Sequence, residues 1–228
     1  MNHSNKIAVI IPAAGASSRF GGLMPKQFSR LGDETVLEKS VNLFLGISSV
    51  NQVVIAVNQN EDLIKSQSFY QDPRIKIVAG GSTRSESVFN AMAEVDESVE
   101  IVAIHDAARP WLKKIHFKDL LSHLANDQSI EGVFPVISAT DSLRMKQGDD
   151  VIPVERENFF HVQTPQIFYH DSLKLTLDKL QQKGLHMSDE SQAMEHAGFK
   201  VLAAPGERSN IKITYFEELT LHIGTDLR

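Results

Sequence analysis

Short, largely apolar runs that are rich in β-branched residues recur along the chain, separated by stretches in which apolar positions have a helical spacing. The runs lie at residues 7–11, 53–57, 75–78, 101–105 and 132–136. The helical stretches lie at 36–45, 85–95 and 115–124. Strands that are apolar on both faces are typical of a parallel sheet, and their alternation with helices is typical of α/β folds. The pattern therefore predicts a doubly wound, mostly parallel α/β sheet.

The alternation stops after residue 136. Residues 140–146 and 151–155 are more polar than the earlier runs, and they flank the turn-rich Gln147-Gly148-Asp149-Asp150. This pattern predicts a β-hairpin, which we expect to project as an arm over about residues 138–157. Helical patterning returns at 173–182 and 190–196, a strand-like run follows at 200–203, and a last helix is expected near 216–223. We expect residues 1–228 to form a single domain with this arm.

Composition excludes several classes of protein. Hydrophobic residues make up 42% and charged residues 23%, which suits a globular chain and argues against disorder or a coiled coil. The formal net charge of −6 argues against a nucleic-acid partner. The chain has no cysteine, so disulfides, thiolate zinc sites and a cysteine nucleophile are excluded. The first apolar run is too short for a signal peptide or a membrane helix, and we expect a cytoplasmic protein without a membrane partner.

The first apolar run leads into a loop of small residues, Pro12-Ala13-Ala14-Gly15-Ala16-Ser17-Ser18, which precedes Arg19. Small residues let backbone N–H groups approach an anion, and open α/β sheets bind ligands where their strands end. Arg19 and Lys26 could add cations for phosphate groups. The loop is neither a P-loop nor a dinucleotide motif, because no Gly-Lys-Ser/Thr follows it and only Gly15 stands at a motif position. A tight turn with two solvated cations is the alternative interpretation.

A second loop, Gly80-Gly81-Ser82-Thr83-Arg84-Ser85-Glu86-Ser87, follows the third apolar run. The two glycines permit close approach to a flat ligand such as a base, and the hydroxyls and Arg84 offer hydrogen-bond donors to its edge. The alternative interpretation is a helix N-terminus with Ser82 or Thr83 as its N-cap, because Ser82 and Ser85, and likewise Thr83 and Glu86, have the spacing of a capping box. Both interpretations can hold together.

A third segment, His105-Asp106-Ala107-Ala108-Arg109-Pro110, follows the fourth apolar run. A single carboxylate at this edge suits Mg²⁺, which takes few protein ligands and several substrate oxygens. Arg109 could bind a second phosphate or simply pair with Asp106. His105 points to the opposite face of the strand from Asp106, and we interpret it as a packed structural histidine.

Six motifs occur in order along nearly the whole chain: Pro12-Ala13-Ala14-Gly15 with Arg19 and Pro25-Lys26-Gln27, Gly80-Gly81 with Arg84 and Ser87, His105-Asp106-Ala107-Ala108-Arg109-Pro110, Thr164-Pro165-Gln166, Ser188-Asp189-Glu190, and Asn210-Ile211-Lys212-Ile213-Thr214. Together they resemble the 2-C-methyl-D-erythritol 4-phosphate cytidylyltransferase family of isoprenoid precursor biosynthesis. The resemblance implies a Rossmann-like nucleotidyltransferase fold. It also implies Mg²⁺-dependent transfer of CMP from CTP to the phosphate of the polyol, giving 4-diphosphocytidyl-2-C-methyl-D-erythritol and pyrophosphate. A homodimer with exchanged arms is the implied assembly.

The resemblance also implies roles for matching residues. The positions expected to contact the nucleotide are Ala13, Ala14, Gly15, Gly81, Ser82, Arg84, Ser87, Asp106 and Ala107. Those expected on the acceptor side are Asp106, Arg109, Ser142, Arg156, Thr164, Ser188 and Lys212. Arg19, Lys26, Lys212 and Arg156 are the candidate catalytic residues, with Arg156 acting in the partner subunit's site. Asp106 is the candidate metal ligand.

Two positions depart from the family's usual pattern. Ser142 stands where a threonine is usual, with Thr140 as the alternative if the register of the arm shifts, and Ser188 stands where a threonine is common. Both changes keep a hydroxyl. The nearest alternative function is that of a ribitol 5-phosphate cytidylyltransferase, which differs in a few side chains of the acceptor pocket. The further alternatives are a sugar-1-phosphate nucleotidyltransferase and a non-catalytic nucleotide-binding module.

Overall fold

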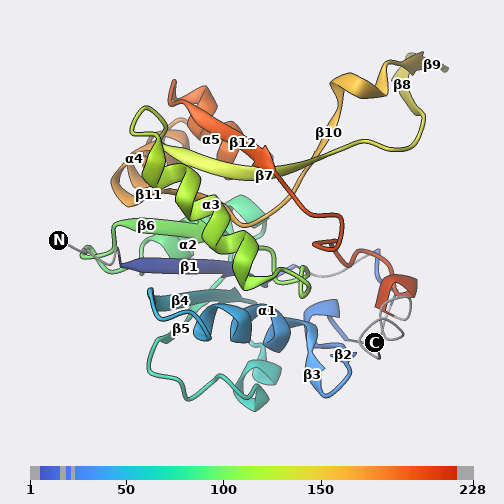
Figure 1. Cartoon of the computed structure of the whole chain (residues 1–228). Coiled ribbons are helices and arrows are strands. Elements are labelled where there is room, and N and C mark those ends of the chain that lie inside the picture. The colour runs from blue at the N-terminus through green and yellow to red at the C-terminus, as the bar shows by residue number, and fades with distance from the viewer. Residues whose placement is uncertain (1–5, 16–18, 22–23, 220–228) are drawn as a thin grey trace.

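A central eight-stranded sheet carries the fold in the computed structural model, which describes residues 6–15, 19–21 and 24–219 (Figure 1). Its strand order is β10 (Phe160–Val162), β7 (Gly132–Ser138), β11 (Gln166–Tyr169), β6 (Ile101–Ile104), β1 (Ile7–Pro12), β4 (Val50–Val57) and β5 (Ile75–Ala79), and β12 (Val201–Pro205) pairs with β7. The pairs β1–β4, β1–β6, β4–β5 and β7–β12 are parallel, whereas β10 and β11 run antiparallel to their neighbours. The prediction of a mostly parallel sheet is confirmed.

Helices cover both faces of the sheet because β1 is apolar on both sides. Val9 and Ile11 pack in one core cluster with side chains of α1 (Val36–Leu45) and α3 (Lys114–Asn126). Ala8 and Ile10 point the other way, into a cluster with α2 (Arg84–Met92), α4 (His170–Gln182) and α5 (Glu190–His196). Alternate residues of a strand face opposite sides of a sheet, so a continuous apolar run requires cover on both. The doubly wound arrangement follows from this requirement.

Two predicted helices match the structure residue for residue. The first, α1, begins after Thr35, whose side chain accepts a hydrogen bond from the backbone N–H of Glu38 while Glu38 accepts one from the backbone of Thr35. This reciprocal capping box satisfies two backbone donors that a helix start would otherwise leave unpaired. The second, α5, begins after Asp189, whose side chain accepts from the backbone N–H of Gln192. Both starts are encoded locally.

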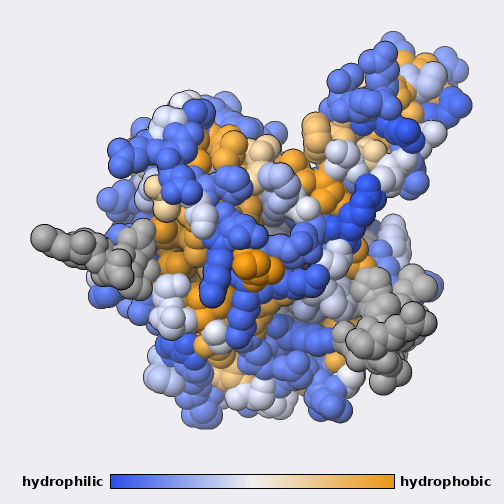
Figure 2. Space-filling model, in the orientation of Figure 1, coloured by the Kyte–Doolittle hydropathy of each residue, from blue (hydrophilic) through white to orange (hydrophobic). Residues whose placement is uncertain are grey.

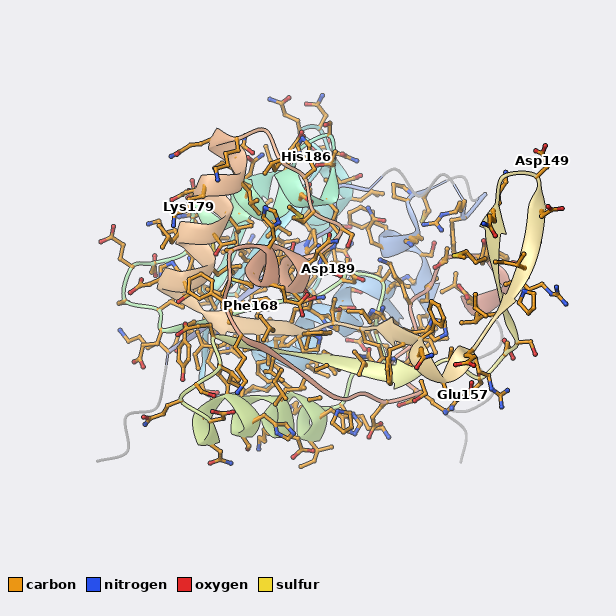
Figure 3. All side chains as sticks on the ribbon, turned by 90° about the horizontal axis from the view of Figure 1, so that it is seen from above. Asp149, Glu157, Phe168, Lys179, His186 and Asp189 are labelled. Atoms are coloured by element: carbon orange, nitrogen blue, oxygen red, sulfur yellow. The ribbon has the colours of Figure 1, made fainter. Side chains whose placement is uncertain are left out.

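The hairpin consists of β8 (Leu143–Gln147) and β9 (Asp150–Val154), which pair with each other in a separate two-stranded sheet. Gly148 takes a φ of 63° in the two-residue turn, a conformation that glycine adopts without steric cost. The hairpin projects away from the body beyond β7 and β10 (Figure 1). Asp149 lies at its tip and Glu157 at its base (Figure 3).

Several elements lie outside the pattern that the sequence predicted. The pattern contained no strand at β10 or β11, because these strands are short and Thr164-Pro165 lies between them. The short strands β2 (Arg30–Leu31) and β3 (Glu34–Thr35) and the 3₁₀ helices η1 (Lys26–Phe28), η2 (Asp62–Ser66) and η3 (Arg156–Asn158) were also not predicted. Of the last predicted helix, residues 217–219 are helical, and residues 220–223 lie outside the described residues. Among the helices of the described ranges, none is long and apolar enough to cross a membrane.

Candidate active site

A pocket with a cavity volume of about 480 Å³ opens where β1, β4, β5 and β6 end. It is lined by Pro12, Ala13, Ala14, Gly15, Arg19, Lys26, Gln27, Asn58, Gly81, Ser82, Thr83, Arg84, Ser87, Asp106, Ala107, Ala108, Lys212 and Thr214. All nine positions expected to contact the nucleotide are in this set, together with Arg19, Lys26 and Lys212. The carboxyl edge of an open α/β sheet is the usual place for a ligand. The fold therefore collects the predicted nucleotide site into one cavity.

The loop after β1 is held by a residue that the sequence analysis gave no role. Gln27 is buried, and its Nε2 donates to the carbonyl oxygens of Ala13 at 2.6 Å and Gly15 at 3.5 Å. These bonds fix the loop carbonyls on the side of Gln27. Residues 16–18 of the same loop lie outside the described residues. In the sequence, the only indication of this role was the position of Gln27 directly after Lys26 in Pro25-Lys26-Gln27.

The base loop after β5 is closed by its own side chains. The N–H of Gly81 donates to Oγ of Ser87 at 3.0 Å, and that hydroxyl donates to the carbonyl of Thr83 at 2.9 Å. The N–H and the hydroxyl of Ser82 both donate to Oε2 of Glu86 at 2.7 Å. Thr83 is the N-cap of α2, so the helix-start interpretation also holds. The loop is closed by these hydrogen bonds and serves both as a helix cap and as a pocket wall.

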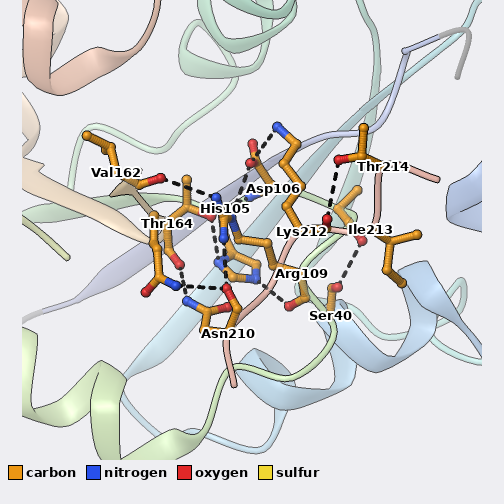
Figure 4. Close-up of polar contacts among 12 residues, drawn as sticks. Ser40, His105, Asp106, Arg109, Val162, Thr164, Asn210, Lys212, Ile213 and Thr214 are labelled. Carbon is orange, nitrogen blue, oxygen red and sulfur yellow. Dashed lines mark hydrogen bonds and ion pairs between the residues drawn. The ribbon is translucent and has the colours of Figure 1, made fainter. Parts of the chain in front are cut away.

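Asp106 lies at the centre of the cationic side of the pocket and is 7% exposed. Its Oδ1 lies 3.2 Å from Nε of Arg84. Its Oδ2 lies 2.9 Å from Nζ of Lys212 and 3.4 Å from Nε of Arg109 (Figure 4). Burial alone would raise the pKa of the Asp106 carboxyl. The three cations outweigh burial and hold that pKa well below its usual range. Asp106 is therefore ionised near neutral pH.

Lys26 stands on the other side of the same cluster. Its Nζ donates to the carbonyl of Ile213 at 2.6 Å. Burial is the main cause that lowers the pKa of Lys26 from 10.5 to about 8, and the positive charge of Lys212 is the second. The negative charge of Asp106 acts in the opposite direction and raises this pKa. Lys26 and Lys212 line the same pocket and repel each other, so a bound phosphate would relieve this repulsion and this part of the pocket favours an anion.

Arg109 and Thr164 lie behind the pocket. Arg109 donates to the carbonyl of Asn210 at 2.7 Å, and Oγ1 of Thr164 accepts from the backbone N–H of Asp106 at 3.0 Å (Figure 4). Both residues are buried, and the structure places them where they hold the turn that carries Asp106. Neither is among the residues that line the described part of the pocket.

His105 is fully buried beneath this turn. Its Nε2 lies 3.1 Å from the carbonyl of Arg109, which can only accept, and its Nδ1 lies 3.2 Å from Oγ1 of Thr164. The proton is therefore on Nε2, and Nδ1 accepts from the Thr164 hydroxyl. Burial lowers the pKa of His105 to about 4, so the ring is neutral near pH 7. The geometry agrees with a packed structural histidine.

The remaining acceptor-side residues are not assembled in one chain. Ser142 and Arg156 belong to the arm and are exposed, and Nη1 of Arg156 donates to the carbonyl of Thr140 at 2.9 Å. Ser188 is exposed in the loop before α5 and bonds to Gln192. Within the described ranges, none of these three lines the pocket. Within the described residues, the structure thus brings the positions predicted for the nucleotide into one pocket but leaves Ser142, Arg156 and Ser188 outside it.

The pocket also contains residues that sequence reasoning missed. Asn58 directly follows β4, and Thr214 follows the Lys212 segment. No motif marks Asn58, and only its position after an apolar run could have identified it. Asp106 is the single carboxylate among the described lining residues, and no cluster of three or more potential metal-ligating side chains occurs in that part of the chain. This donor set fits a magnesium ion that takes most of its oxygens from a nucleotide.

The family model described as 2-C-methyl-D-erythritol 4-phosphate cytidylyltransferase matches residues 7–223. The chain belongs to this family. It is 36% identical over 219 residues to the protein of that name from Actinobacillus pleuropneumoniae serotype 7, with 96% of this chain and 95% of the relative covered. It is 34% identical over 219 residues to the one from Blochmanniella pennsylvanica, with 94% and 92% covered. The solved 4-diphosphocytidyl-2C-methyl-D-erythritol synthase of Anaerococcus prevotii matches with a TM-score of 0.83 at 26% identity, covering 99% of this chain and 97% of that one.

The family resemblance drawn from the six motifs is thereby confirmed, and the chain is a nucleotidyltransferase. The match spans nearly the full length of the cytidylyltransferases compared, so the pocket and the arm both lie within the shared region.

Substituting Gly80 with alanine is expected to lower kcat/KM for the nucleotide about 10- to 100-fold. A Cβ at Gly80 would lie 2.4 Å from Cβ of Ala14 and 3.0 Å from Oγ of Ser87, so the phosphate loop and the base loop would be forced apart. Steady-state kinetics would measure the loss. The matched control is Gly46→Ala, where the new Cβ meets chiefly the flexible end of Lys114. Equal kinetics for the two variants would contradict the close approach of the loops.

Proposed function

We propose that this chain transfers CMP from CTP to the phosphate of 2-C-methyl-D-erythritol 4-phosphate, forming 4-diphosphocytidyl-2-C-methyl-D-erythritol and pyrophosphate. One observation carries the proposal: a single pocket in a chain of this family combines a small-residue loop, a hydrogen-bonded base loop, one carboxylate and a cluster of cations. The relatives from Actinobacillus and Blochmanniella carry the name of this activity.

The reaction is an in-line displacement at the α-phosphorus of CTP. An oxygen of the acceptor phosphate forms a bond to that phosphorus, the bond to the β-phosphate breaks, and pyrophosphate leaves with the electron pair. A phosphate monoester is largely ionised near neutral pH, so the attacking oxygen needs no strong base. Catalysis then depends on positioning and on neutralising charge. A pocket lined by Arg19, Lys26 and Lys212 suits these demands.

Each side of the pocket has its own part in this proposal. Backbone N–H groups of Ala14 and Gly15 and the side chains of Arg19 and Lys26 hold the triphosphate, whereas the N–H of Ala13 donates to the carbonyl of Ala56 at 2.7 Å. Gly81 and Ser82 bring backbone groups to the edge of the base, and Ser87 keeps that loop in place through the N–H of Gly81. The close packing of Gly80 on Ala14 sets the distance between base and phosphates.

Asp106 would hold Mg²⁺ together with oxygens of the nucleotide. When bound, the ion would neutralise charge on the triphosphate. The carboxylate is engaged by three cations in the absence of ligand, so at least one of them must leave Asp106 before the carboxylate can meet a metal. Magnesium alone should therefore bind weakly, and calorimetry with Mg²⁺ in the absence of CTP would test this order.

Exchange of arms between two copies of the chain is proposed to complete the acceptor side. Phe159, Phe160 and Val162 are 44%, 56% and 39% exposed at the base of the arm. Hydrophobic surface gathers there over β10, next to the gap between arm and body (Figure 2). A hairpin standing alone is only marginally stable, and a partner would cover this surface. Arg156 of one copy would then reach the other copy's pocket, with Ser142 or Thr140 beside it and Ser188, Arg109 and Thr164 on the receiving side.

Substituting both Phe159 and Phe160 with serine is expected to convert the dimer to a monomer and to abolish most activity. Burial of one phenylalanine side chain contributes about 1.5–3 kcal/mol to the free energy of association. Because each substitution is present in both copies, the dimer loses roughly twice that amount for every position changed. Analytical ultracentrifugation and turnover would be measured together. Leu175→Ser, at a residue of α4 that is 47% exposed, is the matched control. A wild-type protein that is fully active as a monomer would contradict the in-trans role of Arg156.

The deciding assay is pyrophosphate release with CTP and Mg²⁺, with 2-C-methyl-D-erythritol 4-phosphate and ribitol 5-phosphate offered side by side. Release with the former alone is the expected result. If the enzyme preferred ribitol 5-phosphate, the proposed mechanism would still hold, but the acceptor would be ribitol 5-phosphate. Tight CTP binding without release from either would favour a non-catalytic module, and preference for another nucleoside triphosphate would favour a sugar-1-phosphate nucleotidyltransferase.

A further inference from the structure

Glu190 is a buried carboxylate that the proposed reaction leaves without a role. It is the first residue of α5 and is 2% exposed, since the cap at Asp189 turns the first helical residue inward. Both of its oxygens meet Nη1 of Arg84, at 2.8 and 3.0 Å. Figure 3 shows Asp189 beside this helix start. Glu190 is not among the described lining residues of the active-site pocket, so it acts there through Arg84.

Arg84 connects Glu190 to Asp106. Its Nη1 is held by Glu190, and its Nε donates to Oδ1 of Asp106 at 3.2 Å. An arginine has several donors in a rigid plane, so fixing one end fixes the direction of the other. The two carboxylates and the guanidinium form a chain that runs from α5 to the end of β6.

The two carboxylate oxygens of Asp106 interact with different cations. Oδ1 meets Arg84, whereas Oδ2 meets Lys212 at 2.9 Å and Arg109 at 3.4 Å. The side chain of Lys212 is 40% exposed and that of Arg84 is 27% exposed. A triphosphate in the pocket competes for all of these cations. Lys212 can move onto a phosphate, but Arg84 can leave only if two buried carboxylates lose their partner, which is costly.

We propose that Glu190 is a positioning residue that keeps Arg84 on Oδ1 of Asp106 when the nucleotide draws Lys212 away, so that Oδ2, which then faces only Arg109 at 3.4 Å, becomes available. This inference rests on the proposed function of the pocket. Glu190 sets the orientation of the Asp106 carboxylate without touching substrate. Its removal leaves Arg84 free to follow the triphosphate and leaves Asp106 turned or unpaired.

The first test compares Glu190→Gln with Glu195→Gln, which removes an exposed carboxylate from the same helix. Loss of an outer-shell partner typically costs about 10- to 100-fold, and that fall in kcat/KM is expected for Glu190→Gln. A surface change of this kind should leave Glu195→Gln within about twofold of wild type. Equal values for the two variants would overturn the proposal.

The second test asks whether Glu190 acts through Arg84. In an Arg84→Gln background, adding Glu190→Gln should cause no further loss of kcat, because the link is already broken. In the double variant, glutamines at positions 84 and 190 can still hydrogen-bond to each other, and the buried charges of both Arg84 and Glu190 are removed. The double variant is therefore expected to fold even if the Glu190→Gln variant is unstable. A full additional loss in that background would overturn the proposal.

A third readout does not need turnover. Calorimetry would measure the affinity for CTP with and without Mg²⁺ in wild type and in Glu190→Gln. The variant should bind CTP without Mg²⁺ as tightly as wild type does, but Mg²⁺ should increase its affinity for CTP much less. An unchanged increase would overturn the proposal. If wild type released no pyrophosphate with any acceptor, the proposed function would fail, and this binding comparison would still decide the role of Glu190.

Discussion

Replacing Lys26 with alanine is expected to lower kcat about 100- to 1000-fold, as removal of a donor to developing charge does in other enzymes. Lys26 lines the pocket beside Lys212, and the charge it would face grows as pyrophosphate departs. An interaction that strengthens in the transition state changes turnover more than substrate affinity. Steady-state kinetics would separate the two, with the exposed Lys118→Ala on α3 as control. A change confined to KM would contradict this role.

The same lysine predicts the alkaline limb of the pH profile. Burial, and then Lys212, lower the pKa of Lys26 to about 8, so the free enzyme loses this charge as the pH rises through that value. The parameter kcat/KM should fall with an apparent pKa near 8, and Lys26→Arg should move the limb to higher pH because arginine stays charged. Stability should change in the opposite direction: the unfolded lysine keeps its proton up to about 10.5, so stability rises between pH 8 and 10.5.

Asp106→Asn is expected to reduce the free energy of unfolding by about 3–5 kcal/mol, the usual cost of breaking a buried ion pair by removing one partner. Arg109 and Lys212 would keep their charges with no carboxylate between them, while Arg84 would keep Glu190. Urea unfolding would measure the loss. Asp178→Asn, at an exposed position of α4, is the control and should unfold like wild type.

CTP should offset this loss of stability, because its phosphates supply the negative charge that Asp106 no longer provides. Metal-free CTP is therefore expected to stabilise Asp106→Asn against urea more than it stabilises wild type, while turnover with Mg²⁺ falls. A variant as stable as wild type without ligand would contradict the central position of Asp106 in the charge cluster.

Local patterns in the sequence determined most of the scaffold. The five largely apolar runs all became strands of the sheet. The strands β1, β4, β6 and β7 are mostly buried, as a continuous apolar run predicts, whereas β5 lies at the edge of the sheet and is only partly buried. The helix starts at Thr35 and Asp189 were set by side chains within three residues of the helix. The meeting of the positions proposed for the nucleotide in one pocket was predictable for a related reason: the loops that follow parallel strands all meet at one edge of the sheet.

Only the tertiary structure decided which distant residues meet. The short strand β11 lies between β6 and β7 in the sheet. This arrangement places Thr164 against the backbone of Asp106, although the two residues are 58 positions apart in the sequence. The tertiary structure also paired Arg84 with Glu190 across 106 positions. Hydrophobic periodicity and capping depend on near neighbours, so a sequence reveals them directly. The partner of a buried charge depends on how whole elements pack, and at Asp106 that packing determines which cation stays and which can move to the substrate.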